Sequence, residues 1–313
     1  MPMPLLRSAI LAASRNPALR DVVTSAPVTR DVVKRFVAGV TVDDVIETTR
    51  GLAAEGLKST VDRLGEDVTN ESEAQQTVTD YLELLDHLAA AGLAASVEVS
   101  VKLSAVGQAL SESGPAQAIE RARIICRRAA EIGTTVTLDM EDHTTTDLTL
   151  AAVRELRQEF PSVAVVLQAY LRRTGDDCRA MAYSGSRVRL CKGAYREPAD
   201  VAFATRSEVD VSYVRLMRGL IASQATPLFA THDPRLIDIA TSLIAESERR
   251  SDSYEFQMLL GVRPEEQRRL ASEGHTVRVY VPYGTDWWGY LMRRMAEKPA
   301  NLALFTRSLI STR

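Results

Sequence analysis

The stretch Ser96-Val-Glu-Val-Ser-Val-Lys-Leu103, followed by the helical pattern Ala116–Glu131 and by Thr134-Thr-Val-Thr-Leu-Asp139, decides the fold. Both short runs are rich in the β-branched residues that strands favour, and a segment with helical periodicity separates them. Two strands joined through a long helix are typical of a parallel β–α–β unit. We therefore predict that residues 96–139 form one such unit.

The same alternation continues through most of the chain. Further β-branched runs occur at residues 57–61, 163–168, 187–191, 226–231, 254–259 and 277–281. About eight strands alternating with helices over roughly 250 residues favour a closed (β/α)8 TIM barrel. An open doubly wound sheet is the alternative, although the chain has neither the GxGxxG nor the GxxxxGK[ST] motif that usually marks such a sheet.

The first 55 residues contain helical patterns and no strand pattern. Thr41-Val-Asp-Asp44 resembles a capping box, so we expect a helix that begins there and stops near Gly56. We therefore divide the chain into an N-terminal helical segment, residues 1–55, which packs on the barrel, and the barrel itself, residues 56–313.

Composition restricts the compartment and the partners. The 313 residues are 45% hydrophobic and carry a net charge of −3, and no basic stripe indicates a nucleic-acid partner. Cys126, Cys178 and Cys191 are odd in number and form no CxxC motif, so neither disulfides nor a thiolate zinc site is indicated. This cysteine pattern predicts a reducing, cytoplasmic setting. No apolar run approaches the roughly 18 residues that span a bilayer, and the apolar N-terminus lacks a convincing cleavage site.

Polar side chains gather at the carboxyl ends of the predicted strands, where barrel enzymes place their active sites. In chain order they are Asp62, Glu66, Lys102, Ser104, Asp139, Glu141, Asp142, His143, Gln168, Tyr170, Arg189, Lys192, Gly193, Ala194, Tyr195, Thr231, His232, Asp233, Glu255, Gln257 and Tyr280. We call the opening of the barrel at these carboxyl ends the mouth. The cations among these residues, together with two arginines near the C-terminus, predict that the mouth binds a large anionic ligand and a small carboxylate.

Tyr290-Leu-Met-Arg-Arg294 follows the last predicted strand and its loop. Residues three and four apart share a helix face, so Tyr290, Arg293 and Arg294 are expected to point the same way. Paired guanidiniums suit a bidentate grip on a carboxylate or phosphate, which predicts an anion clamp. A solvated basic helix face remains the alternative.

Other residues in the mouth have more than one interpretation. Asp139-Met-Glu-Asp-His143 resembles a metal site, but no second histidine stands at ligand spacing, so we expect Asp139 to orient nearby cations instead. Lys102 and Lys192 each follow a strand. A lysine at such a position could be a Schiff-base nucleophile, part of an anion clamp or a cap on the barrel end. The pair Trp287-Trp288 either walls a pocket or packs against a neighbouring helix.

Arg187-Val-Arg-Leu-Cys-Lys-Gly-Ala-Tyr195 is the densest of these runs. Gly193 and Ala194 are small, so a flat ring could approach the backbone there. Arg189 is expected to project from the end of its strand, where a cation beside a flavin would favour the reduced, anionic flavin. A salt-bridged barrel rim is the alternative.

Seven motifs in this order resemble those of proline dehydrogenases. They are Ser100-Val-Lys-Leu-Ser104, Leu138-Asp-Met-Glu141, Val166-Leu-Gln-Ala-Tyr170, Arg189-Leu-Cys-Lys-Gly-Ala-Tyr195, Ala230-Thr-His232, Glu255-Phe-Gln-Met-Leu259 and Tyr290-Leu-Met-Arg-Arg294. The resemblance covers about residues 55 to 300 and is to the small monofunctional bacterial type, without the aldehyde dehydrogenase half of the bifunctional enzymes. It implies a distorted (β/α)8 barrel with non-covalent FAD. The implied reaction is hydride transfer from C5 of L-proline to FAD, giving Δ1-pyrroline-5-carboxylate, and the electrons pass on to a quinone.

The resemblance also implies roles for individual residues. Residues expected to contact proline or act in catalysis are Lys102, Asp139, Ala194, Tyr195, Leu259, Tyr280, Tyr290, Arg293 and Arg294. Within this group, Lys102 and the two arginines bind the carboxylate, and Asp139 supports the arginine and tyrosine side chains. Residues expected to hold FAD are Gln168, Arg189, Lys192, Gly193, Ala194, Thr231, His232 and Glu297. Glu66 matches a carboxylate that pairs with the clamp arginine and gates the site.

Three features leave alternatives open. The last β–α loop is shorter than in the bifunctional enzymes and carries the two tryptophans, and Arg196 stands where those enzymes place an aromatic residue near the flavin. The sequence does not separate proline from 4-hydroxyproline as substrate, nor does it dismiss a Schiff-base aldolase or a non-catalytic amino-acid sensor. Use of a quinone implies a transient contact with the inner face of the membrane, for which the apolar tail 301–313 is a candidate if it does not pack on the barrel.

Overall fold

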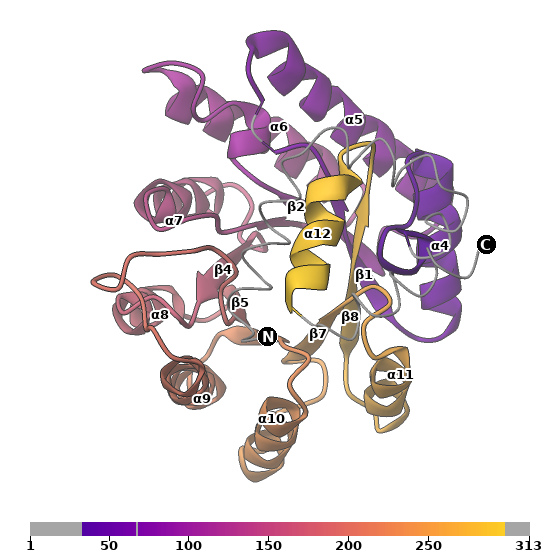
Figure 1. The fold of residues 1–313 in the computed structure, drawn as a ribbon. Helices are drawn as coiled ribbons and strands as arrows, with labels where there is room; N and C mark the ends of the chain where they lie inside the picture. Colours follow the sequence, from indigo (N-terminus) through magenta and orange to yellow (C-terminus); the bar gives the residue numbers. More distant parts are fainter. Residues whose placement is uncertain (1–32, 67, 298–313) are drawn as a thin grey trace, which may run out of the picture.

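The computed structural model describes residues 33–66 and 68–297, with side chains described as far as Met292. Eight parallel strands close into a barrel in the order β1 to β8, and helices surround it (Figure 1). The strands are β1 Lys58–Arg63, β2 Val97–Val101, β3 Val136–Leu138, β4 Ala164–Gln168, β5 Arg187–Cys191, β6 Thr226–Ala230, β7 Glu255–Leu259 and β8 Val277–Tyr283. The helices are α4 Val42–Ala54, α5 Glu71–Ala90, α6 Gly114–Glu131, α7 Thr146–Leu156, α8 Thr174–Met181, α9 Arg206–Ala222, α10 Pro234–Glu246, α11 Pro264–Ser272 and α12 Trp287–Glu297, with a short 3-10 helix η1 Ser104–Val106. Within these described ranges, no helix has the combination of length and apolar character that crossing a membrane requires.

The register of β1 against β8 closes the barrel. Lys58 pairs with Arg278 at one end of this ladder, and Arg63 pairs with Tyr283 at the other. All other neighbouring strands also pair in parallel. The predicted barrel is therefore confirmed and the open doubly wound sheet is excluded, because an open sheet would leave β1 and β8 as unpaired edges.

Helix α4 covers the seam where the barrel closes. It begins with the predicted capping box, in which the Asp44 N–H donates to Thr41 Oγ1 over 3.2 Å and the Thr41 N–H donates to Asp44 Oδ2 over 2.9 Å. Val45 and Ile46 lie in the main hydrophobic core, and the helix contacts both β1 and β8. A helix that precedes the first strand thus takes the place on the outer wall that the last helix of a regular barrel would fill.

Helix α12, which follows β8, takes a different position. Figure 1 draws it in yellow in the middle of the ring of helices. Trp288, Tyr290 and Leu291 form a second hydrophobic cluster with Phe36 and with Leu64, the residue directly after β1. This contact holds α12 at the carboxyl end of β1, beside the mouth. Of the two roles considered for Trp288, the contact favours packing and not the lining of a pocket, since Trp288 is buried.

The interior of the barrel is polar because its strands alternate apolar and polar residues. In β2, Val97, Val99 and Val101 belong to the main core, whereas Glu98 and Ser100 bond to residues of other strands inside the barrel. The two sets point to opposite faces, as alternate residues of a strand must. Bulky branched side chains usually fill a TIM barrel, so this interior is unusual.

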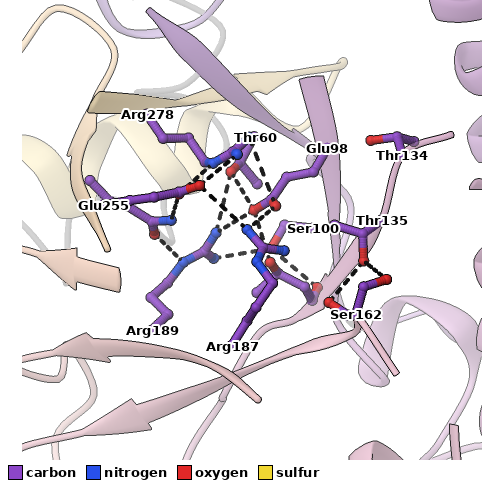
Figure 2. A network of polar contacts seen from close by, with 12 residues as sticks. Thr60, Glu98, Ser100, Thr134, Thr135, Ser162, Arg187, Arg189, Glu255 and Arg278 are labelled. Atoms are coloured by element: carbon purple, nitrogen blue, oxygen red, sulfur yellow. Dashed lines mark hydrogen bonds and ion pairs between the residues drawn. The ribbon is translucent and has the colours of Figure 1, made fainter. Parts of the chain in front are cut away.

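Figure 2 shows a network of ion pairs inside the barrel. Arg187 Nη2 lies 2.7 Å from Glu98 Oε2, and Arg278 Nε donates to Glu255 Oε2 over 2.7 Å. Burial alone would raise the pKa of Glu98, but Arg187, Arg278 and Arg189 lower it well below its ordinary value. Burial also opposes ionisation of Glu255, yet Arg278 lowers its pKa to about 2. Four strands, β2, β5, β7 and β8, are therefore joined through side chains as well as through their backbones.

Candidate active site at the barrel mouth

A buried lysine lies at the centre of the mouth. Lys102, directly after β2, is 8% exposed, and its Nζ donates to both carboxylate oxygens of Asp62, over 2.8 and 2.9 Å. The same Nζ lies 3.4 Å from Asp139 Oδ2, 3.6 Å from Glu66 Oε1 and 3.5 Å from the Tyr280 hydroxyl. Lys102 thus joins groups of β1 and β8 with groups of the loops that follow β1 and β3.

Asp139 organises the neighbouring polar groups. Its Oδ2 accepts a hydrogen bond from the Tyr280 hydroxyl over 2.7 Å, and its Oδ1 accepts one from Arg189 Nη1 over 2.9 Å. The guanidinium of Arg189 also stands over the Tyr280 ring, 5.6 Å from its centre. These contacts fix the orientation of the tyrosine at the mouth.

Electrostatics keep the central lysine charged. Burial alone would lower the pKa of Lys102, but Asp62, Tyr280 and Asp139 raise it well above its ordinary value. Burial raises the pKa of Asp62 to about 6, although Lys102 opposes this shift, so the Asp62 carboxyl is ionised at neutral pH. The mouth therefore presents a permanent ammonium group, which suits recognition of an anion.

The sequence indicated that Arg189 projects from the end of its strand, and this prediction is wrong. It is the third of the five residues of β5, it is 4% exposed, and it extends into the barrel. Its guanidinium bonds to Gln257 of β7 and, besides Asp139, to Glu98 and Thr60. Arg189 therefore connects the ion pairs inside the barrel, through Glu98, with the mouth, through Asp139.

Apart from Glu297 of α12, the remaining residues assigned to the cofactor lie at the ends of β4, β5 and β6. Gln168 Nε2 donates to the backbone oxygens of Met140 and Glu141, over 3.3 and 2.9 Å, whereas its buried Oε1 has no hydrogen-bond partner among the described residues. Lys192 Nζ lies 2.5 Å from Asp210 and 3.0 Å from Asp233.

Thr231 and His232 directly follow β6, and their side chains accept hydrogen bonds from neighbouring backbone N–H groups. The Thr231 hydroxyl accepts a hydrogen bond from the Asp233 N–H over 3.2 Å. His232 Nε2 accepts one from the Leu259 N–H over 2.8 Å, which ties the end of β6 to the end of β7. Leu259 itself is half-buried.

The segment Gly193–Tyr195 also reaches the mouth, but the room beside Gly193 is already filled. Gly193 has φ +109°, and a Cβ there would lie 2.3 Å from Cδ1 of Tyr170. The flat ring that approaches this backbone is therefore the chain's own tyrosine. Ala194 is exposed and Tyr195 is half-buried.

The acidic run after β3 does not converge on one point. Asp139 faces Lys102 and Arg189, Glu141 accepts hydrogen bonds from Ser104, and His143 contacts Glu197. Within residues 33–66 and 68–292, whose side chains are described, no group of three or more His, Cys, Asp or Glu side chains is arranged to hold a metal ion. The orienting role expected of Asp139 agrees with its contacts.

Comparison with known proteins gives the family. A sequence profile of proline dehydrogenase matches residues 45–307. The chain is 39% identical over 306 residues to proline dehydrogenase 1 of Bacillus subtilis strain 168, which covers 98% of this chain and 99% of that relative. It is 36% identical over 308 residues to the proline dehydrogenase of Deinococcus radiodurans, which covers 98% of each. This chain belongs to the proline dehydrogenase family.

Solved structures agree on the fold. Proline utilization A from Bdellovibrio bacteriovorus, inactivated by N-propargylglycine, superposes with a TM-score of 0.79 at 27% identity over 86% of this chain. The match covers 33% of that longer chain, so this proline dehydrogenase family member spans about a third of it. Proline utilization A from Bradyrhizobium japonicum matches with a TM-score of 0.70 at 21% identity, which supports the fold alone.

The clamp that the family resemblance assigns to α12 is only partly described. Residues 287–297 form the predicted helix, and Tyr290 is buried in the cluster that holds it. The side chains of Arg293, Arg294 and Glu297 lie outside the described part of the chain, as does the tail 301–313. Glu66, the expected gate, contacts Lys102 in the described structure.

Sequence reasoning assigned no role to two residues that are central here. Asp62 was noted only as a polar residue at the end of β1, although it is the main partner of Lys102. Glu98 was overlooked altogether. The strict alternation Val97-Glu-Val-Ser-Val-Lys102 was the available signal, because an ionisable residue on the inner face of a barrel strand must have a partner there.

Proposed function

We propose that this chain oxidises L-proline to Δ1-pyrroline-5-carboxylate, with FAD as the hydride acceptor and a membrane quinone as the final electron acceptor. The observation that carries the proposal is the buried ammonium group of Lys102, held at the mouth by Asp62 and Asp139. A charged donor at the mouth of a proline dehydrogenase barrel suits the carboxylate of an amino acid.

The residues at the mouth fit FAD. Gln168 Oε1 is a buried acceptor without a donor among the described residues, and leaving such a group unsatisfied is costly. An N–H group of FAD would satisfy it. When bound, FAD supplies the two-electron acceptor that receives the hydride from C5 of proline. Arg189, Lys192, Gly193, Ala194, Thr231, His232 and Glu297 would complete its site.

The chain's own residues would bind and orient proline. Lys102, Arg293 and Arg294 would hold the carboxylate, and Tyr280, Tyr290 and Leu259 would pack over the ring. Holding the substrate at several points converts a bimolecular encounter into an oriented one. The cations at the mouth would also disfavour the protonated amine, because like charges repel, and the amine must be neutral to lose the hydride.

The environment of the two lysines argues against a Schiff-base aldolase. A lysine nucleophile must be uncharged, and such lysines have a lowered pKa. Lys102 has a raised pKa because of its carboxylate partners, and Lys192 lies between two aspartates. Lys102 is therefore charged and suited to binding an anion, and Lys192 is already engaged by two carboxylates.

The test is the visible absorption spectrum of the purified protein before and after anaerobic addition of L-proline. We expect the bands of oxidised flavin to be present and to bleach with proline, and the colour to return when a soluble quinone is added. The variant Lys102→Met should keep the bands but need a much higher proline concentration to bleach.

Other results would change the proposal in defined ways. Flavin bands that persist with L-proline but bleach with 4-hydroxyproline would reassign the substrate. A colourless protein that cannot be reconstituted with FAD would contradict the proposed cofactor and reaction together.

A further inference from the structure

One carboxylate joins three loops of the barrel mouth. Glu197 lies in the segment 192–205 between β5 and α9, and its side chain is 2% exposed. Its Oε1 accepts hydrogen bonds from the Tyr170 hydroxyl over 2.8 Å and from the His143 N–H over 3.1 Å. Its Oε2 contacts His143 Nδ1, which donates in the tautomer that carries the proton on Nδ1.

The partners of Glu197 lie close to residues assigned to the site. His143 stands four positions after Asp139 in the loop that follows β3, and Tyr170 stands two positions after Gln168 in the loop that follows β4. Glu197 itself follows Gly193–Tyr195 in the loop after β5. A single buried group thus sets the distances between three loops that all contribute to the mouth.

Tyr170 is held at both ends by the segment that it supports. Its ring packs on Gly193, where a Cβ would approach to 2.3 Å, and its hydroxyl bonds to Glu197. Its backbone N–H donates to Lys192 O over 2.9 Å, and its backbone oxygen accepts from the Phe203 N–H over 2.8 Å. The turn between Gly193 and Glu197, which carries Ala194 and Tyr195, is therefore tied down at each end.

We propose that Glu197 is a positioning residue for the reaction, acting through Tyr170 and His143 to fix the segment 193–196 against the cofactor and proline. The inference rests on the proposed function, because that function assigns Gly193, Ala194 and Tyr195 to FAD and substrate. The proposed function assigns Glu197 itself to neither FAD nor proline. A small displacement of residues that contact substrate is enough to slow an oriented reaction strongly.

The test compares Glu197→Gln with wild type in the full-length protein. The amide removes the negative charge and sets an NH2 donor against His143 Nδ1, which now faces a carboxylate oxygen, at little change of shape. We expect the KM for proline to rise about tenfold or more, the FAD dissociation constant from flavin fluorescence to rise several-fold, and kcat to fall less than KM rises. The thermal midpoint of the apoprotein should stay close to wild type, since the barrel core is untouched.

Two further variants make the result interpretable. Tyr170→Phe removes one donor and keeps the ring on Gly193, so it should show the same changes to a smaller extent and serves if Glu197→Gln does not fold. Glu159→Gln removes a surface carboxylate that pairs with Arg123 and should leave KM and FAD affinity unchanged. Wild-type KM and FAD affinity in both mouth variants, or in Tyr170→Phe if Glu197→Gln does not fold, would overturn the inference even with a lowered thermal midpoint.

Failure of the inference and failure of the proposed function give different results. If proline does not bleach the wild-type flavin, the proposed reaction fails, and FAD affinity in the variants still tests the positioning role. If wild type is bleached normally and both variants behave like it, the reaction stands and Glu197 has no positioning role.

Discussion

Lys102 and Asp62 form a buried ion pair whose members depend on each other for charge. Removing one partner of such a pair leaves an uncompensated charge in a poorly solvated place. Two cations, Lys102 and Arg189, face three carboxylates, those of Asp62, Glu66 and Asp139, around this point. Further cations beside Lys102 would strengthen its hold on an anionic substrate, which is a physical reason to propose the paired arginines of α12 as part of the clamp.

The substitution Asp62→Asn tests the dependence of Lys102 on its main partner. We expect kcat/KM for proline to fall about thirtyfold or more, mainly through KM, because loss of a charge-assisted contact costs roughly 2 kcal/mol or more. Steady-state kinetics measure this effect. Asp252→Asn, which breaks an exposed pair with Arg250, is the matched control and should behave as wild type. Equal kinetics in both variants would mean that Asp62 does not orient the lysine.

Gly193 is a position where only a residue without a Cβ fits. Gly193→Ala would place a Cβ into the Tyr170 ring at a backbone φ of +109°, so we expect a loss of roughly 1–3 kcal/mol of stability and weaker FAD binding. Urea unfolding and flavin fluorescence measure the two effects. Gly219→Ala in α9, where a Cβ meets nothing within 4 Å, should instead stabilise the protein by about 0.5–1 kcal/mol. Similar results for the two glycines would show that the Tyr170 contact does not constrain Gly193.

Helix α12 owes its place to a few apolar side chains. Trp288→Ala removes the largest of them from the cluster with Phe36 and Leu64, which should cost about 3–5 kcal/mol of local packing. Because α12 carries Tyr290 and the two arginines proposed to hold the carboxylate, we expect the KM for proline to rise together with a lowered thermal midpoint. Trp287→Ala is the control, since Trp287 is half-buried and should matter less. An unchanged KM in Trp288→Ala would separate the packing of α12 from substrate binding.

Elements were predictable from the sequence where the signal is local. The capping box of α4 lies within four residues, and the β-branched runs identified all eight strands to within a few residues. The packing of α12 at the mouth was not predictable in this way. Its contacts reach Phe36 and Leu64, more than 200 positions earlier in the chain, and no periodicity within α12 reports them.

The whole barrel was predictable from the rhythm of its elements, but its polar interior was not. Lys102 and Asp62 are 40 positions apart, and Lys102 and Tyr280 are 178 apart, so these groups meet only when the barrel closes. The resemblance to proline dehydrogenases supplied Lys102, Asp139 and Tyr280 as site residues. It did not supply Asp62 or Glu98, because roles that depend on partner geometry become visible only in three dimensions.

The ion pairs that join the strands predict how the whole molecule responds to acid. The pKa of Glu255 is lowered in the folded barrel to about 2 from an ordinary value of 4.5, chiefly by Arg278 against the opposing effect of burial. The unfolded chain therefore binds a proton more tightly than the folded one. The stabilisation, on the order of 3 kcal/mol, is fully present above about pH 4.5 and is lost as the pH falls toward 2. Asp62, whose pKa is raised to about 6, changes stability in the opposite direction, so wild type alone does not isolate the effect.

The variant Glu255→Gln isolates it. At pH 7 the variant should be less stable than wild type, because Arg278 loses its carboxylate inside the barrel. As the pH falls below about 4.5, the wild-type glutamate begins to lose its advantage, so the gap between the two unfolding free energies should narrow. Urea midpoints measured between pH 7 and pH 3 follow this gap, and the Asp62 contribution cancels because both proteins contain it. Curves that stay parallel over this range would mean that Arg278 does not hold Glu255 ionised and that this ion pair contributes no acid sensitivity to the fold.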